Sequence, residues 1–450
     1  MIRTTFHLVS LGCAKNSVDS DSMTQLLERD GYQAVGASQQ ASILIVNTCG
    51  FISSAREESY SMLRALAKIK RPDQLLIAAG CLTQRYGEEV ARQVPGVDGI
   101  LGTRRWMDIV EVVRQLRKKP QPSAGPRQAK RDPLYHLPES PTIGRDENGV
   151  LRAAIAGASA YLKIADGCRR SCAFCAVPLI KGSTISRPLG TLLQEARQLR
   201  DLGIRELILI AQDTTDYGHD LGMQDGFATL LDQITAAVPE VDWIRILYAF
   251  PGYVTDRLID MMSSHPQILP YLDIPLQHAA PAVLTRMRRP ANIDWVLNTI
   301  SKMRSKLPKL AIRTTFIVGY PGETDEEFQM LLDFIKEMRF DRAGAFQFSF
   351  EAGTASEVLG DPIPAAVKEE RYRRLMELQQ SISLQINQSY VGQKLDVLIE
   401  GQNEGIAIGR SFRDAPEIDG YVVVEGIAEI GSIIPVKITG AMAYDLTGIR

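Results

Sequence analysis

Short apolar runs alternate regularly with helical patterns, and this alternation constrains the fold of the chain most strongly. In the first 118 residues the apolar runs are 6–12, 43–48, 75–80 and 99–102, and helical patterns cover about 17–29, 54–70, 83–93 and 106–118. Such alternation predicts a parallel sheet with helices on its faces. The runs are rich in Leu, Ile and Val, which fits strands buried on both faces. We therefore expect residues 3–118 to form a doubly wound α/β domain.

A cysteine directly follows each of the first three runs. Cys13, Cys49 and Cys81 end the motifs SLGC, VNTC and AAGC. In an open parallel sheet the carboxyl ends of the strands share one edge, where ligands bind. A buried cysteine is often only a small apolar side chain, but three at equivalent positions favour a shared site. The adjacent Asn16 and Asn47 could contact a ligand or could shape the turns and helix starts.

The second set of cysteines carries the strongest signal in the chain. Cys168, Cys172 and Cys175 are spaced Cys-x3-Cys-x2-Cys. Thiolates are the usual ligands of iron–sulfur clusters, and a 4Fe–4S cluster normally takes four of them. This loop offers three, so one iron would be open to a substrate or cofactor. A structural zinc site needs a closed set of four ligands, and the nearest histidines, His136 and His219, lack zinc-finger spacing.

The region after this loop repeats strand and helix six times. The expected strands are 161–165, 206–211, 243–249, 271–276, 312–319 and 343–350, with helices at about 190–202, 227–237, 255–264, 293–306 and 324–338. Six β/α units over residues 154–382 predict an incomplete TIM-like (β/α)6 barrel, and active sites of such barrels lie at the strands' carboxyl ends. Polar residues gather at these ends: Gln212, Asp213, Tyr248, Gln277, His278, Tyr320, Glu323 and Glu351. Each of them could equally be a helix cap.

Two further segments flank this region. Residues 104–131 are rich in Arg and Lys, and prolines follow Lys119, so we expect a linker and an irregular hairpin over 119–153. After a long amphipathic helix at 364–390, short strands separated by glycine predict a small closed OB-like β-barrel over 385–450.

The motif CRRSCAFC, with Phe174 before its last cysteine, resembles the signature of the radical S-adenosylmethionine (radical SAM) superfamily. Together with the first three-cysteine domain, the chain resembles the methylthiotransferases of that superfamily along essentially its whole length. The position and size of the C-terminal barrel match a TRAM domain. Four stretches are more similar to the ribosomal-protein branch of the family than to the tRNA branch: residues 10–21, 210–218, 272–278 and 314–324.

This resemblance implies two 4Fe–4S clusters, one on Cys13, Cys49 and Cys81 and one on Cys168, Cys172 and Cys175. The second cluster would bind SAM and, with an external electron donor, cleave it to methionine and a 5′-deoxyadenosyl radical. That radical would take hydrogen from the β-carbon of an aspartate in ribosomal protein S-twelve. A sulfur donor and the methyl group of a second SAM would then complete 3-methylthioaspartate.

Contacts to SAM are expected from residues at the barrel's carboxyl end. Many radical SAM enzymes carry Gly-Gly-Glu after the second strand, where this chain reads AQDTT, so another residue would hold the SAM amino group. The candidates are Phe174, Gln212, Asp213, Gln277, Gly319 and Glu323.

Charge and composition argue against several classes of protein. The net charge is −2, so the chain is no obvious nucleic-acid binder. It has no apolar run of membrane-spanning length and no secretory signal pattern. Six cysteines are too few for a disulfide scaffold of 450 residues, which fits a cytoplasmic protein.

The C-terminal region has its own charge balance. Residues 382–450 hold nine acids and five bases, a net of −4, which would repel RNA and attract a basic protein such as S-twelve. The acids could equally be scattered for solubility. Two alternative functions are open: methylthiolation of tRNA adenosine, and noncatalytic iron–sulfur electron transfer.

Overall fold

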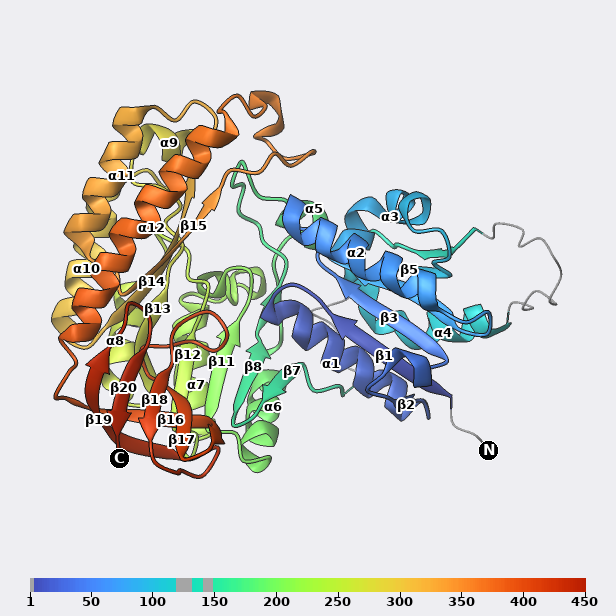
Figure 1. Ribbon diagram of the computed structural model, residues 1–450, viewed down its shortest axis with the longest axis horizontal. Coiled ribbons are helices and arrows are strands. Elements are labelled where there is room, and N and C mark those ends of the chain that lie inside the picture. Colours follow the sequence, from blue (N-terminus) through green and yellow to red (C-terminus); the bar gives the residue numbers. More distant parts are fainter. Residues whose placement is uncertain (1–3, 119–131, 141–148) are drawn as a thin grey trace. The chain divides into compact units, whose positions relative to one another are not determined.

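The computed structural model describes residues 4–118, 132–140 and 149–450 (Figure 1). The chain divides into two compact units. The first comprises Met1–Ala154, Tyr161–Arg170 and Cys175–Pro188, and the second comprises Ile155–Ala160, Ser171–Phe174 and Leu189–Arg450. None of the helices in the described ranges has both the length and the apolar character that a membrane span requires.

A six-stranded sheet forms the centre of the first unit. Its strands are β1 (Thr5–Ser10), β2 (Gln33–Ala34), β3 (Ile43–Thr48), β4 (Leu75–Gly80), β5 (Gly99–Gly102) and β6 (Leu134–His136). They lie in the order β2-β1-β3-β4-β5-β6, and every neighbouring pair is parallel. The parallel-sheet prediction is confirmed, and β3, β4 and β5 have the predicted bounds.

The sequence placed residues 134–136 in an irregular hairpin, and the structure differs there. These residues instead form β6 and pair in parallel with β5. A three-residue strand is too short to show an alternating pattern, so only its neighbour in the sheet reveals it. The remainder of the predicted linker and hairpin at 119–131 and 141–148 lies outside the described residues. The proposed domain boundaries stay predictions.

Helices cover both faces of this sheet. They are α1 (Ala14–Arg29), α2 (Ser53–Ile69), α3 (Cys81–Gln93) and α4 (Ile109–Lys118), with short turns η1 (Ser38–Gln40) and η2 (Thr103–Asp108). Because successive strand side chains point to opposite faces, Ile43 and Ile45 pack with α1 and α4, while Leu44 and Val46 pack with α2 and α3. The sheet is therefore doubly wound, as the sequence predicted.

The first unit also holds the stems of the second cysteine loop. β9 (Ala165–Asp166) pairs with β10 (Ile185–Ser186) in an antiparallel ribbon, and the short helix α5 (Val177–Lys181) precedes β10. This pairing brings the two ends of the loop together.

The central region contains a seven-stranded sheet in the order β15-β14-β13-β12-β11-β8-β7. Its strands are β7 (Ala153–Ala156), β8 (Ser159–Lys163), β11 (Glu206–Ile210), β12 (Trp243–Ile246), β13 (Ile268–Asp273), β14 (Ala311–Val318) and β15 (Arg342–Gln347). The division between the units runs through β7 and β8. β11 to β15 pair in parallel in chain order, as consecutive β/α units require. β7 is a strand that the sequence did not predict.

Helices connect the parallel strands. They are α6 (Leu189–Asp201), α7 (Gly226–Ala237), α8 (Asp256–Ser264), α9 (Pro281–Arg286), α10 (Ile293–Lys306) and α11 (Asp325–Met338), with turns η4 (Thr214–Asp216), η5 (His219–Leu221) and η6 (Glu357–Leu359). α11 begins with a capping box, in which the Thr324 hydroxyl and the Glu327 carboxylate bond each other's backbone amides. The five longer helices agree with the predicted ranges to within about two residues.

The C-terminal part consists of the long helix α12 (Ala365–Gln388) and a closed five-stranded barrel. The barrel strands are β16 (Lys394–Asn403), β17 (Ile406–Ser411), β18 (Val422–Glu425), β19 (Ile433–Ala441) and β20 (Leu446–Ile449). They close in the order β16-β17-β18-β20-β19 around buried Val397, Val436 and Ile438. The predicted small barrel is confirmed, and β20 is a strand that the sequence analysis missed.

A buried cluster of charges ties this barrel to the central sheet. Glu206 on β11 accepts hydrogen bonds from Arg245 Nε at 2.7 Å and from Arg410 Nη2 at 2.6 Å, and all three side chains are fully buried. Ser159 Oγ donates to the same carboxylate at 2.8 Å. Burial raises the pKa of Glu206, but the two guanidinium groups outweigh it and lower the pKa to about 2.

We expect Glu206→Gln to destabilise the protein by roughly 3–5 kcal/mol near neutral pH, because it leaves two guanidinium groups buried without their carboxylate. The folded-state pKa lies below the ordinary 4.5. The ionised carboxylate therefore stabilises the fold fully above about pH 4.5, and this stabilisation is lost as the pH falls toward about 2.

Urea unfolding followed by circular dichroism at several pH values measures this difference. Wild type and Glu206→Gln should converge in acid. Glu400→Gln is the matched control: Glu400 also bonds Arg410, but its side chain is 30% exposed, so we expect a loss below about 1 kcal/mol. Equal losses in the two variants would contradict the prediction.

Candidate functional site

The first three cysteines lie where the strand order of the first sheet reverses. β1 lies between β2 and β3, and the helices that follow β1 and β3 cover opposite faces. Ligands of open α/β sheets bind at such a switch point. Because Ser10 pairs with Asn47 and Thr48 pairs with Gly80, the turns that carry Cys13, Cys49 and Cys81 start at the same edge.

Two glycines allow these turns to approach closely. Gly12 has φ +96°, and a Cβ there would lie 2.9 Å from Cys49 Cβ and 3.2 Å from Cys49 Sγ. Gly80 has φ +107°, and a Cβ there would overlap Asn47 Oδ1. Larger residues disfavour this backbone conformation, so glycine before Cys13 and Cys81 is required by both conformation and space.

Asn16 connects all three cysteine turns. Its Nδ2 donates to the carbonyl oxygens of Leu11 at 2.8 Å and Thr48 at 3.1 Å, and the Cys81 thiol lies 3.7 Å from its Oδ1. Asn47 Nδ2 in turn donates to the backbone oxygen of Asn16 at 3.0 Å. Both amide side chains are buried. Of the two readings that the sequence left open, the structure supports shaping of the turns.

The thiols of this site act on one another electrostatically. Burial raises the pKa of Cys49, and it raises that of Cys81 to about 12, with the nearby Cys49 and Cys13 adding to the rise. The Cys13 side chain is exposed, and the Lys15 charge and the backbone amides of Asn16 and Lys15 lower its pKa. A bound metal centre would take these groups as thiolates, and its positive charge would offset theirs.

A buried ion-pair network adjoins the same site. Lys181 on α5 binds Asp19 on α1 at 3.0 Å and Asp166 at 3.3 Å. Its positive charge lowers the pKa values of Cys13 and Cys81. The network also includes Lys163 and Arg152. No sequence pattern marks Lys181 as a site residue, because its partner Asp19 is distant in the chain.

The residue types of the first site fit an iron–sulfur cluster. In a 4Fe–4S cluster each thiolate binds a different iron, and the turns of Cys13, Cys49 and Cys81 bring three thiol ligands to one edge of the sheet. Within the part of the chain that the structure describes, no three Cys, His, Asp or Glu side chains converge on one position that a single metal ion could take.

The cysteines of the second set are held by different contacts. Cys168 is buried, and its amide donates to the Gly182 carbonyl oxygen at 3.0 Å. Cys172 and Cys175 are partly buried. The Cys172 Sγ accepts a hydrogen bond from Arg289 Nη1 at 3.5 Å.

The structure gives the positions of Phe174, Gln212 and Asp213, three of the residues expected to contact SAM. Phe174 is partly buried against a cluster that includes Tyr320 and Phe348. Gln212 and Asp213 follow β11 after Ala211, and Asp213 is buried and accepts a hydrogen bond from Thr215 Oγ1 at 2.6 Å. Their contact with SAM stays a prediction.

Gln277, Gly319 and Glu323 follow β13 and β14. Gln277 has φ +73° and bonds the backbone of β14 through its own amide and carbonyl. Glu323 is buried, and its Oε2 accepts from the amides of Gly319 and Tyr320. A Cβ at Gly319 would overlap Lys368. Gly319 and Glu323 thus shape their own turn, and their contact with SAM also stays a prediction.

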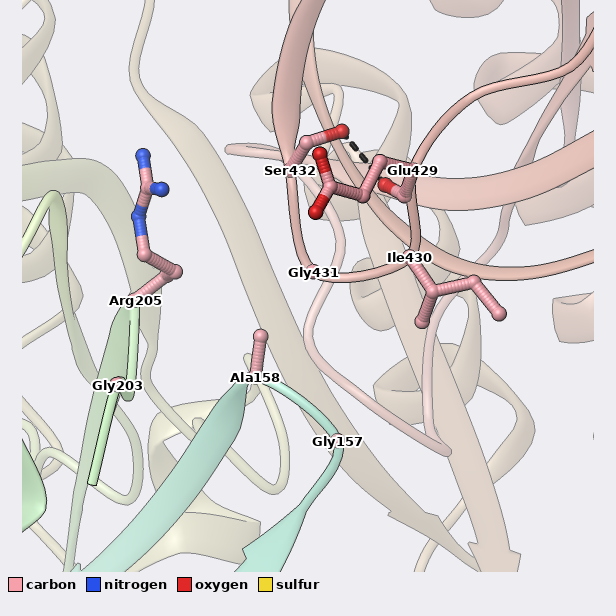
Figure 2. Close-up of a pocket in the computed structure, with 8 residues that line it drawn as sticks. All are labelled: Gly157, Ala158, Gly203, Arg205, Glu429, Ile430, Gly431 and Ser432. Atoms are coloured by element: carbon pink, nitrogen blue, oxygen red, sulfur yellow. Dashed lines mark hydrogen bonds between the residues drawn. The ribbon is translucent and has the colours of Figure 1, made fainter.

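A separate cavity of about 350 Å³ lies in the second unit (Figure 2). It is lined by the turn at 157–158, by Gly203 and Arg205, and by the barrel loop 429–432. Arg205 and Glu429 are its two charged groups, and none of the predicted site residues lines it. Arg205 pairs with Asp242.

Comparisons with known proteins agree with this architecture. The uncharacterized protein family UPF0004 matches residues 5–102, the radical SAM superfamily matches 162–335, and the TRAM domain matches 391–449. A ribosomal protein uS12 methylthiotransferase RimO from Chloroflexus aurantiacus is 48% identical and covers 98% of this chain and 99% of its own. The chain belongs to the RimO family. The prediction of a radical SAM methylthiotransferase is thereby confirmed.

Other relatives extend this comparison. A RimO protein from Roseiflexus sp. is 45% identical and covers 98% of this chain and 96% of its own. Among solved structures, the radical SAM methyltransferase TsrM from Kitasatospora setae superposes with a TM-score of 0.57. It covers 90% of this chain and 80% of its own at 13% identity, which shows a shared fold.

We expect Asn16→Ala to loosen the first site and leave the second intact. The substitution leaves the buried carbonyls of Leu11 and Thr48 without their donor, at a cost of about 1–3 kcal/mol each. Iron bound after anaerobic reconstitution should fall from about eight to about four per chain, since each cluster holds four. Asn298→Ala, an exposed asparagine on α10, is the control and should keep the full iron content. Equal iron in both variants would contradict the assigned role of Asn16.

Proposed function

We propose that this protein adds a methylthio group to the β-carbon of an aspartate in ribosomal protein uS12, giving 3-methylthioaspartate, in the cytoplasm. One observation carries the proposal: relatives named for this activity are 43–48% identical along 98% of the chain. The two three-cysteine motifs, one in each α/β region, would supply the thiolate ligands of the clusters that this reaction needs.

The cofactors that we propose are two 4Fe–4S clusters and SAM. Cys13, Cys49 and Cys81 would hold one cluster, and Cys168, Cys172 and Cys175 the other. When bound, the clusters and SAM supply the radical that removes an unactivated hydrogen, which no side-chain base can remove near neutral pH. An external electron donor and a sulfur donor are also needed.

The residues of the chain position and insulate these groups. Asn16 and Asn47 hold the first three cysteine turns in register. Lys181 provides a buried positive charge beside them. At the second site, Phe174, Gln212, Asp213, Gln277, Gly319 and Glu323 are the proposed contacts to SAM.

The charge of the barrel supports a basic protein substrate. Of its five basic residues, Arg410 and Arg413 are buried in ion pairs with Glu206 and Asp341. The exposed bases are Lys394, Lys437 and Arg450, and the exposed acids are Asp396, Glu400, Glu404, Glu417, Glu425 and Glu429. Three bases against six acids leave the exposed barrel at −3. Such a surface repels RNA phosphates and attracts a basic ribosomal protein.

Mass spectrometry after reaction with each substrate tests the proposed function. Reconstituted enzyme, SAM and a reductant should add one methylthio group to an aspartate-containing peptide of uS12, and none to tRNA. A gain on tRNA alone would instead establish the alternative of adenosine methylthiolation. Absence of 5′-deoxyadenosine would support noncatalytic electron transfer.

Cysteine variants separate the two sites in the same assay. Replacing Cys168, Cys172 and Cys175 with Ala should abolish formation of 5′-deoxyadenosine. Replacing Cys13, Cys49 and Cys81 should leave SAM cleavage in place and stop methylthio transfer. Unchanged cleavage in the first variant would overturn the assignment of that site.

Charge reversal on the barrel tests the substrate contact. We expect Glu404→Lys with Glu425→Lys to raise the KM for uS12 several-fold, with kcat unchanged and with a weaker dependence on salt, because exposed charges mainly set the association rate. Glu337→Lys, on the exposed face of α11, is the control. A KM that responds equally to both changes would argue against docking on the barrel.

A further inference from the structure

Arg289 presents its guanidinium to Cys172, and both residues belong to the second unit. It lies just after α9, and its Nη1 donates to Cys172 Sγ at 3.5 Å. Its Nη2 donates to the Pro275 carbonyl oxygen, and its Cζ lies 4.3 Å from the centre of the Phe250 ring. Only 9% of Arg289 is exposed.

This guanidinium differs from those of Arg245 and Arg410 in its partners. Arg245 and Arg410 share the carboxylate of Glu206, whereas no Asp or Glu of the described residues forms an ion pair with Arg289. Its Nε is buried without a hydrogen bond. A buried charge without a counter-charge is costly, and the Phe250 ring offsets only part of this cost. The Cys172 sulfur, which accepts a hydrogen bond from Arg289 Nη1, can become an anion.

The backbone beside Cys172 holds this contact in place. The Ala173 amide donates to the Met287 carbonyl oxygen at 2.8 Å, and the Ser356 amide donates to the Ala173 carbonyl oxygen at 2.8 Å. The segment that carries Arg289 is therefore bonded directly to the segment that carries Cys172. The pairing follows from the fold of both segments and not from one side-chain rotamer alone.

We propose that Arg289 is a positioning residue that supplies the counter-charge and an N–H···S hydrogen bond to the Cys172 thiolate, and so raises the reduction potential at the second cysteine set. The inference rests on the proposed function, because it requires Cys172 to be a ligand of the second cluster. Hydrogen bonds to sulfur and net charge both set the potential of iron–sulfur clusters. One-electron reduction adds a negative charge, which a fixed guanidinium stabilises.

A redox titration of the second site alone tests this role. In a chain with Cys13, Cys49 and Cys81 replaced by Ala, electron paramagnetic resonance follows reduction by dithionite in the presence of mediators. We expect Arg289→Met to lower the equilibrium constant for reduction about tenfold, which is about 59 mV for one electron. Arg289→Lys keeps the charge and should recover part of the shift.

Arg286→Met is the matched control, because Arg286 lies on the same segment, pairs with Glu327 at 2.7 Å and forms no hydrogen bond with a cysteine of the described residues. It should leave the potential unchanged. If Arg289→Met retains about four irons and the same potential as its parent, the inference is wrong while the proposed function stands. A parent chain that binds no iron would contradict both.

If Arg289→Met loses its iron, the iron content of Arg289→Lys distinguishes a role of the charge from a purely structural role. Iron retained in Arg289→Lys and lost in Arg289→Met would support a role of charge. Iron lost from both variants would overturn the inference, since it would show that Arg289 acts through its hydrogen bond to Pro275 and holds the fold only.

Discussion

Parallel strand pairing is the constraint on which the rest of this structure depends. It forces the carboxyl ends of β1, β3 and β4 to one edge, so three cysteines that are 32 or more residues apart in sequence begin adjacent turns. The same rule orders β11 to β15 and places the polar residues that follow them at one end of the central sheet. The first cysteine site and the polar residues after β11 to β15 are consequences of this geometry. The second cysteine loop is instead closed by the antiparallel pair β9 and β10.

Buried cations form the second common element of the two sites. Lys181, held by Asp19 and Asp166, acts on the thiols of Cys13 and Cys81. Arg289 reaches Cys172 without an acidic partner among the described residues. Thiolate sites that carry negative charge away from water need such counter-charges. The chain places them on elements that come from different parts of the sequence.

In the barrel, burial decides which of the charged residues contribute to the outer surface. Arg410 and Arg413 count as bases in the sequence, but both are buried against carboxylates outside the barrel. They therefore join the barrel to the central sheet and contribute little to its outer surface. Among the exposed charges of the barrel, six acids outnumber three bases, which supports the proposal of a basic protein partner.

The sequence by itself determined the alternation of strands and helices, the closed C-terminal barrel and the two cysteine sets, because hydrophobic period and motif spacing are local properties. The bounds of β3, β4 and β5 follow from it directly. Only the tertiary structure decided the pairing of β6, the role of Asn16 across three turns and the contact of Arg289 with Cys172. The last of these contacts joins residues 117 positions apart, and no periodic pattern marks a partner at that distance, so it exists only once the chain has folded.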